Sequence, residues 1–241
     1  MATFALTDCT IWLNDVELSP ISNAYELSMD AAVLDVSTFG DSWRQVLMGN
    51  RMATWSATGW WDTANNQGQR QWDSFESPPA QPVLTVSDAG DEGDVAYLSE
   101  PEAVTVSRSG QYGEAAGMMI GGGTRGRVYR GIISLGMQSI TGSTNGTGVQ
   151  FAGGVAAGEV VAMAVHVTAD DGTSVDVILE SDDNAGFTSA TTRATAAVTG
   201  TTYTFLETVA GAVTDDYWRV RTASLVGTSF TIGAAIGIAT A

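Results

Sequence analysis

The feature that most constrains the fold is a succession of short apolar runs separated by turn residues. Residues 51–61 alternate polar and apolar side chains, and residues 160–167, 175–180 and 217–222 form further short runs. Alternation with a period of two is typical of a half-buried strand, whereas an amphipathic helix repeats every three to four residues. Gly (28 residues) is abundant enough to supply turns between the runs, while Pro (5 residues) seldom interrupts them. The sequence therefore predicts an all-β fold.

One segment departs from this pattern and predicts a short flanking helix. Residues 65–77 read NNQGQRQWDSFES, with Trp72 and Phe75 three residues apart on one prospective face. Prolines at positions 78, 79 and 82 follow and would end any helix. We therefore expect an all-β protein with one helix after the first strands.

A change in composition divides the chain into two predicted domains. Residues 141–148 (TGSTNGTG) contain no apolar side chain and are typical of a linker or a long turn. The runs after this segment are regularly spaced, as in a compact β-sandwich. We expect a first β-barrel or sandwich domain over residues 1–140, a linker over 141–148, and a C-terminal β-sandwich over 149–241.

Charge and cysteine content exclude several classes of protein. The chain carries 27 acidic and 10 basic residues, a net charge of −17, and all the basic residues are Arg. Such a surface repels phosphates, so DNA or RNA binding through a basic patch is not expected. Cys9 is the single cysteine, which rules out an intrachain disulfide. The first ten residues do not resemble a signal peptide, and no apolar run approaches about 20 residues, so we expect assembly in the cytoplasm without a membrane.

The residues that usually carry chemistry occur here without partners. His166 is the only histidine and lies within an apolar strand-like run, which favours a structural role. Residues 121–126 match G-x-G-x-x-G, but a strand-like run follows where a nucleotide site needs a helix, so a loop or hairpin is expected instead. A calcium site at Asp170–Asp171 or Asp182–Asp183 stays an alternative, although the twelfth position of an EF-hand loop would be Arg193. We predict no catalysis and no cofactor or metal.

Two groups of residues are candidates for an assembly surface. The segment 36–50 lies between two predicted strands and is too apolar for a loop that stays uncovered, so we expect a neighbouring subunit to pack against it. A second group is three closely spaced arginines, whose planar side chains suit pairing with carboxylates of a neighbouring subunit. The candidate residues are Phe39, Asp41, Trp43, Arg44, Leu47, Met48, Arg125, Arg127 and Arg130.

Several short motifs occur in an order that resembles the major tail protein, or tail tube protein, of siphophages. The resemblance begins with IWLNDVELSPISNAYELSMDA and continues with LDVSTFGDSWRQVLMGNRMATWSATGWWD. The residues that match the pattern of that family are Asp35, Thr38, Phe39, Gly40, Gly59, Trp61 and Asp62. The run RGRVYRGIISLG, with Arg130–Gly131, resembles the family's closing strand. The stretches ILESDDNAGFTSATTR and VTDDYWRVRT resemble a C-terminal β domain found in some members.

This resemblance implies a structural virion protein in the phage tail. It implies that six copies close into a ring by pairing their sheets, and that the rings stack into a tube through which DNA passes without specific binding. Tape measure, tail terminator and distal tail proteins are the further partners it implies. The C-terminal domain would lie outside the tube, or else would form a second tube-like domain, so that three chains close the ring. The main alternative is a carbohydrate-binding or decoration protein on the virion surface, motivated by the aromatic residues and by the predicted C-terminal β-sandwich.

Overall fold

The computed structural model describes residues 9–40, 42–62, 67–76, 81–199 and 204–240. Within these residues the chain forms twelve strands, one α-helix and one short 3-10 helix, Ser19–Ile21. The elements are β1 (Thr10–Leu13), β2 (Val16–Glu17), β3 (Ser22–Asp35), β4 (Val46–Trp60), α1 (Gln67–Glu76), β5 (Leu84–Ser87), β6 (Val95–Ser109), β7 (Gly117–Ile140), β8 (Val149–Gln150), β9 (Glu159–Asp182), β10 (Thr191–Thr199), β11 (Thr204–Ala210) and β12 (Tyr217–Thr240). The prediction of an all-β fold with one short helix is confirmed. No helix of the described residues is long and apolar enough to cross a membrane.

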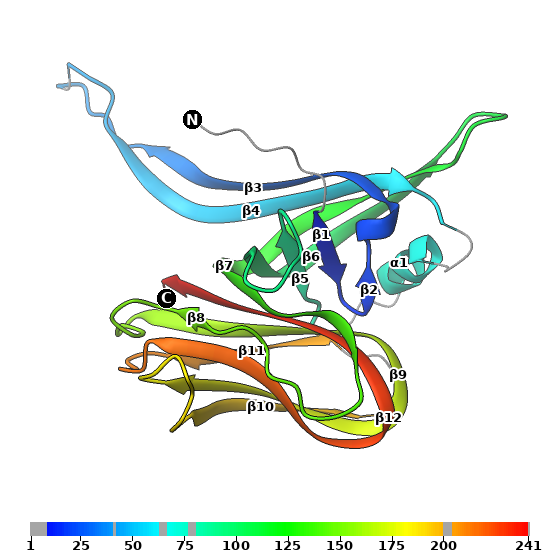
Figure 1. The fold of residues 1–241 in the computed structure, drawn as a ribbon. Coiled ribbons are helices and arrows are strands. Elements are labelled where there is room, and N and C mark those ends of the chain that lie inside the picture. Colours follow the sequence, from blue (N-terminus) through cyan, green and yellow to red (C-terminus); the bar gives the residue numbers. More distant parts are fainter. Residues whose placement is uncertain (1–8, 41, 63–66, 77–80, 200–203, 241) are drawn as a thin grey trace.

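The N-terminal half is a sandwich of two antiparallel sheets that share bent strands. One sheet has the order β3-β4-β7-β6, and it uses the first part of β7 and the last part of β6. The other has the order β2-β1-β5-β6, with the first part of β6 also pairing with the middle of β7. Between the sheets lies an apolar cluster that includes Ile11, Leu84, Trp55 and Ile120. Figure 1 shows the long β3 and β4 running across the top of this half.

Polar side chains of helix α1 hold it beside this sandwich. Arg70 forms an ion pair with Asp15 in the turn between β1 and β2. Gln71 is buried, while Trp72 stays partly exposed near β6. The helix therefore lies next to the part of β6 that forms an end of the four-stranded sheet (Figure 1).

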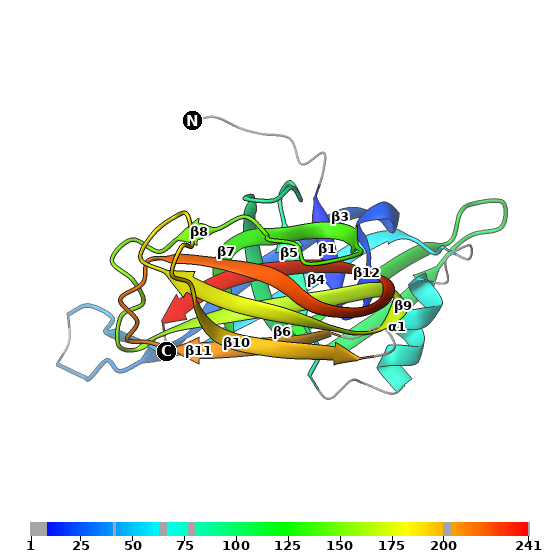
Figure 2. The ribbon, with the colours of Figure 1, turned by 60° about the horizontal axis from the view of Figure 1, so that its bottom comes forward.

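The C-terminal half is built from two long strands that bend and so contribute to both layers of a second sandwich. β9 pairs along its first part with β11 and along its second part with β10, and β12 pairs with both parts of β9. The bend of β9 lies near Gly172, where an added Cβ would come within 2.3 Å of the Phe230 ring. Figure 2 shows the curved β9 and β12 beside β10. The enclosed core includes Val165, Val177 and Trp218.

The hydrogen-bonded sheet continues from one half of the chain into the other. The last part of β7 pairs with β12, from Arg130 opposite Ile238 to Ile140 opposite Phe230. The segment 141–148 is held against both strands, since the amide of Thr147 donates to the carbonyl of Ser134 (2.6 Å) and the amide of Gly146 donates to that of Val220 (2.8 Å). Whether residues 1–140 fold as a separate domain stays a prediction.

A third apolar cluster lies between the two halves. Successive residues of β9 point to opposite faces, so Val161, Met163 and Val165 enter the C-terminal core, while Ala162 and Ala164 face the N-terminal half. The small alanines leave room for larger residues of the N-terminal half. These are Trp12, Val83, Leu98, Tyr129 and Ile133. The junction is therefore a packed apolar interface.

His166 forms a polar contact within this junction and is fully buried. Its Nδ1 lies 2.8 Å from the carbonyl oxygen of Asn14, and its Nε2 lies 2.8 Å from the hydroxyl of Thr85. A neutral ring satisfies both contacts by donating from Nδ1 and accepting at Nε2. Burial lowers the pKa of His166 to about 4, and the hydrogen bond to Asn14 opposes this shift in part. The prediction that this histidine is structural is consistent with its place.

We expect His166 to make folding stability depend on pH between about 6.5 and 4. The folded-state pKa of about 4 lies below the ordinary value of 6.5, so the unfolded chain binds the proton first as the pH falls. Its contribution is complete above pH 6.5, and up to about 3 kcal/mol is lost as the pH drops to 4. Urea unfolding at several pH values measures this loss. His166→Gln should remove this part of the pH dependence; an unchanged profile in that variant would contradict the assignment.

Candidate functional site

The most exposed apolar part of the molecule is the hairpin formed by β3 and β4. β4 pairs with β7 only from Thr54 onward, so residues 29–52 form a two-stranded ribbon that extends beyond the third strand. We call residues 29–52 the finger; it projects from the upper left of Figure 1. Its exposed large apolar side chains are Met29, Val33, Leu34, Val36, Phe39, Trp43, Val46, Leu47, Met48 and Met52. A two-stranded hairpin is marginally stable alone, and apolar side chains on both its faces need a covering partner.

The end of the finger is ordered by contacts within its own chain. The Asp35 carboxylate accepts from the Ser37 amide (3.0 Å) and pairs with Nε of Arg44 (3.0 Å). These groups lower the pKa of Asp35, with the Ser37 hydrogen bonds as the largest cause. The Ser37 hydroxyl in turn accepts from the amide of Gln45 (2.8 Å). These contacts tie the two strands together just below the tip that carries Phe39 and Trp43.

The sequence prediction for this segment is corrected in one respect. Residues 36–50 were expected to form a loop, but β4 begins at Val46, so Leu47 and Met48 lie on a strand. They pair with Leu34 and Val33 of β3. Asp41 lies outside the described residues. The assembly role of these residues stays a prediction.

The three candidate arginines lie around an irregularity in β7. Arg125 pairs with Glu102 of the same chain at 2.8 Å, which lowers the pKa of that carboxyl, so this arginine already has a partner within its own chain. Gly126 has a φ of +73°, and β7 carries more residues than β6 between Arg125 and Tyr129. Simple alternation therefore does not place Arg125 and Arg127 on one face. Arg127 and Arg130 are exposed.

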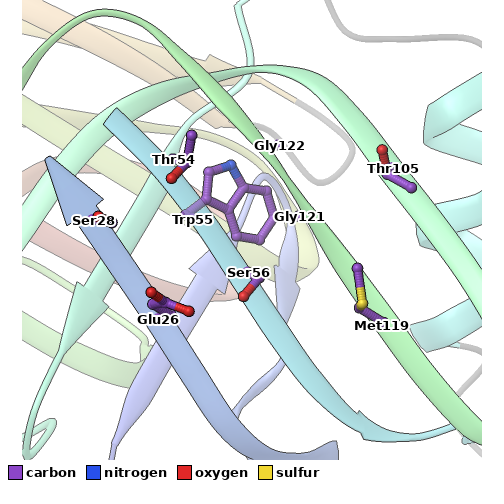
Figure 3. Close-up of a pocket in the computed structure, with 9 residues that line it drawn as sticks. All are labelled: Glu26, Ser28, Thr54, Trp55, Ser56, Thr105, Met119, Gly121 and Gly122. Carbon is purple, nitrogen blue, oxygen red and sulfur yellow. The ribbon is translucent and has the colours of Figure 1, made fainter. Parts of the chain in front are cut away.

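The outer face of the four-stranded sheet bears mainly small polar side chains and glycines, together with the exposed apolar residues Met52, Trp60 and Met119. Glu26 pairs with Ser56, Ser56 with Gly121, and Gly121 with Thr105, so one row crosses all four strands. A shallow pocket of about 380 Å³ lies on this face. Figure 3 shows its lining, with Glu26 and Ser28 on β3 and Met119 on β7. The glycines of the G-x-G-x-x-G match thus lie in a strand, not in the loop that the sequence predicts.

A second pocket, of about 480 Å³, lies between α1 and β6 on the inner face of the same sheet. Trp61 forms one wall, and the guanidinium of Arg108 lies 4.9 Å from the centre of its ring. Trp72 forms another wall, and its indole Nε1 donates to Glu76 (3.2 Å). The lining residues are Trp61, Gln69, Trp72, Val106, Ser107 and Arg108. We call this the α1–β6 pocket. This pocket is not visible in the sequence because Trp61 and Trp72 meet Val106, which lies 34 residues after Trp72, only in the folded chain.

The acidic loop considered for calcium is held by hydrogen bonds within the protein. The Asp182 carboxylate accepts from the amide and hydroxyl of Ser189 (2.8 and 3.1 Å) and from the amide of Asn184 (3.2 Å). These contacts lower the pKa of Asp182, the Ser189 amide being the largest cause. Within the described ranges there is no group of three or more side chains suited to hold a metal ion.

No protein-family model matches the sequence, and no curated protein matches it. Among solved structures, it is similar to a chain from the virion of a native gene transfer agent particle, with 21% identity, 50% of this chain and 93% of that chain covered, and a TM-score of 0.38. It is similar to the anti-feeding prophage cap, with 12% identity, 55% and 94% coverage, and a TM-score of 0.36. It is also similar to the Dit protein of SPP1, with 12% identity, 97% and 100% coverage, and a TM-score of 0.34. At these scores the similarities assign no function to this chain.

Proposed function

We propose that this chain is a non-enzymatic virion protein that polymerises into the stacked rings of a phage tail tube. The observation that carries the proposal is the four-stranded sheet β3-β4-β7-β6, which has an unpaired strand at each end. Among the described strands, β3 pairs only with β4, and residues 102–109 of β6 pair only with β7. Unpaired edges of this length are usually covered or paired in a native protein.

The two edges are suited to pair with each other in neighbouring copies. The four strands alternate in direction, so β3 and β6 run antiparallel to one another. β3 of one copy can therefore extend the ladder at β6 of the next copy without any change in pattern. Such a head-to-tail interface joins two different surfaces of neighbouring copies. It forms a closed ring when the rotation from each copy to the next adds up to one full turn. Six copies are the number that the family resemblance implies.

The outer face of this sheet is suited to line a channel for DNA. Besides serine, threonine and glycine it carries Glu26 and Asp30, which repel phosphates, and three exposed apolar residues that offer them no charge: Met52, Trp60 and Met119. Two arginines of these strands point to the opposite, inner face, because side chains alternate along a strand. They are Arg51, which lies opposite Ala31, and Arg108, which lies opposite Met118. DNA would thus meet a wall without a free positive patch, since Arg125 is held by Glu102. The finger, with its apolar faces, would then contact the adjacent ring or subunit.

The alternative of a carbohydrate-binding protein gains less support from the geometry. Sugar binding requires an exposed aromatic face for stacking. In the C-terminal half, Trp218 and Phe230 are buried, and Phe151, Phe187 and Tyr217 are partly buried. Among the side chains that the structure describes, the exposed aromatic ones lie on the N-terminal half and include Phe39, Trp43 and Tyr112.

The test of the proposal is the state of the purified protein at high concentration. Because each copy carries a charge of −17, we expect assembly to strengthen as salt screens repulsion between copies. Electron microscopy should then show rings or hollow cylinders of constant diameter. Sedimentation that shows only monomers at every salt and protein concentration would contradict the proposal.

A further inference from the structure

We propose that the α1–β6 pocket receives the side chain of Met29 from the neighbouring copy in the ring. The inference rests on the proposed function and specifies what fills this pocket. The occupant is therefore a second copy of the chain, which adds β3 to the edge of β6 and inserts one apolar side chain into the pocket that Trp61 and Trp72 line.

The pocket lies where an added strand would place a side chain. Val106, Ser107 and Arg108 belong to the unpaired edge of β6, and Val106 points to the inner face, where it packs against the N-terminal core. Side chains on the inner face of an added strand would therefore point toward α1. Trp72 is 39% exposed in the single chain, so its ring has apolar surface left to cover.

In a closed ring, the pairing of β3 in one copy with β6 in the next copy brings Met29 to the pocket. Within one copy, Tyr25 and Val106 lie in the same row across the four strands. Strands of a closed barrel tilt by about 35–45°, which displaces each strand by about one residue relative to its neighbour. Across the four strands of one copy the displacement adds up to about four residues. Because four is an even number, residues that meet across the interface still point to the same face of the sheet. Val106 then lies beside Met29 of the next copy. Displacement in the other direction would reach Ile21, which precedes β3 and is buried in its own core.

Met29 is also the first side chain on this face that is free to be inserted. It follows Tyr25 and Leu27, which pack against the core of their own copy. Met29 itself is 66% exposed, and the strand opposite it offers only Ala53. A flexible methionine fits an irregular aromatic pocket well, since its sulfur makes favourable contacts with aromatic rings.

The inference is tested by substituting matched methionines on the two faces of the finger. Met52 is 59% exposed, but it pairs with Asp30 and so faces the other side of the ribbon. We expect Met29→Asn to raise the critical concentration for assembly at least about tenfold, because full burial of a methionine contributes that much to an association constant. Met52→Asn should raise it by a clearly smaller factor, because Met52 faces away from the pocket. Trp72→Ala, which removes one wall, should act like Met29→Asn.

A cross-link locates the contact directly. In a Cys9→Ser background, Met29→Cys with Val106→Cys should give a ladder of covalent oligomers when assembled protein is oxidised, and Met52→Cys with Val106→Cys should not. If tubes form but neither the ladder nor the effect of Met29→Asn is seen, the pocket assignment is wrong while the tube function stands. If the unmodified chain never assembles, both are wrong.

Discussion

A chain whose finger is shortened is expected to remain a folded monomer that no longer assembles. Replacing residues 33–48 by Asn-Gly removes the tip and keeps the ladder between Met29 and Ala53, and Asn-Gly suits a two-residue hairpin turn. The deleted side chains are mostly exposed and contribute little to the stability of one copy. The same exposed apolar surface is what a neighbour would cover. Thermal unfolding should therefore change by little, while sedimentation shows the loss of large species.

Point substitutions provide the control for this deletion. Phe39 at the tip of the finger and Tyr112 at the turn between β6 and β7 are both fully exposed aromatic residues. Phe39→Ser combined with Trp43→Ser should weaken assembly, whereas Tyr112→Ser should weaken it less. Normal tubes from the shortened chain would show that residues 33–48 of the finger have no part in assembly.

Removal of the C-terminal half is expected to unfold the remaining chain. Truncation after residue 142 takes away β9 and β12, and with them Ala162, Ala164 and Ala235, against which Trp12 and Ile133 are buried. It also leaves the last part of β7 without its partner β12. Exposed apolar surface and an open strand edge together favour aggregation. We expect residues 1–142 to be insoluble or to lack a cooperative unfolding transition.

The control for truncation is a cut without removal. A protease site placed within residues 141–148 breaks the chain at the same point but leaves β7 paired with β12. The two fragments should stay associated and unfold together. If residues 1–142 are instead soluble and unfold as cooperatively as the full chain, the sequence-based division into separable domains gains support.

Local sequence predicted the strands well but not their length. Residues 160–167 and 175–180 read as two strands because Asp170, Asp171 and Gly172 are typical of a turn, yet they belong to the single strand β9. The chain bends there instead, because Gly172 admits the Phe230 ring and faces Gly227, whose φ is +111°. The same types of residue are typical of a bend within one strand and of a turn between two strands. Only the contact with β12, more than 50 residues away, separates them.

The candidate site was predictable in part for a similar reason. The apolar character of residues 36–50 is visible in the sequence and identified Phe39 and Trp43 correctly as exposed. Met29 and Met52 escaped notice because each belongs to a run that reads as an ordinary half-buried strand. Their exposure arises because β7 ends its pairing with β4 at Thr54. The point at which one strand extends beyond its neighbour is set by the pairing of strands in the sheet. The pattern of residues along a single segment does not contain this information.

Strand β7 fixes how the C-terminal half is oriented relative to the four-stranded sheet. This strand pairs with β4 and β6 at one end and with β12 at the other, so one continuous strand is hydrogen-bonded to both halves. Each C-terminal half is thus held at a fixed angle to its own four-stranded sheet. In the proposed tube, the outer surface becomes a regular array in which the same group recurs at constant spacing. A ligand with several binding groups could then contact several copies at once, because the spacing between copies is fixed. Its overall affinity would be much higher than that of a single weak contact.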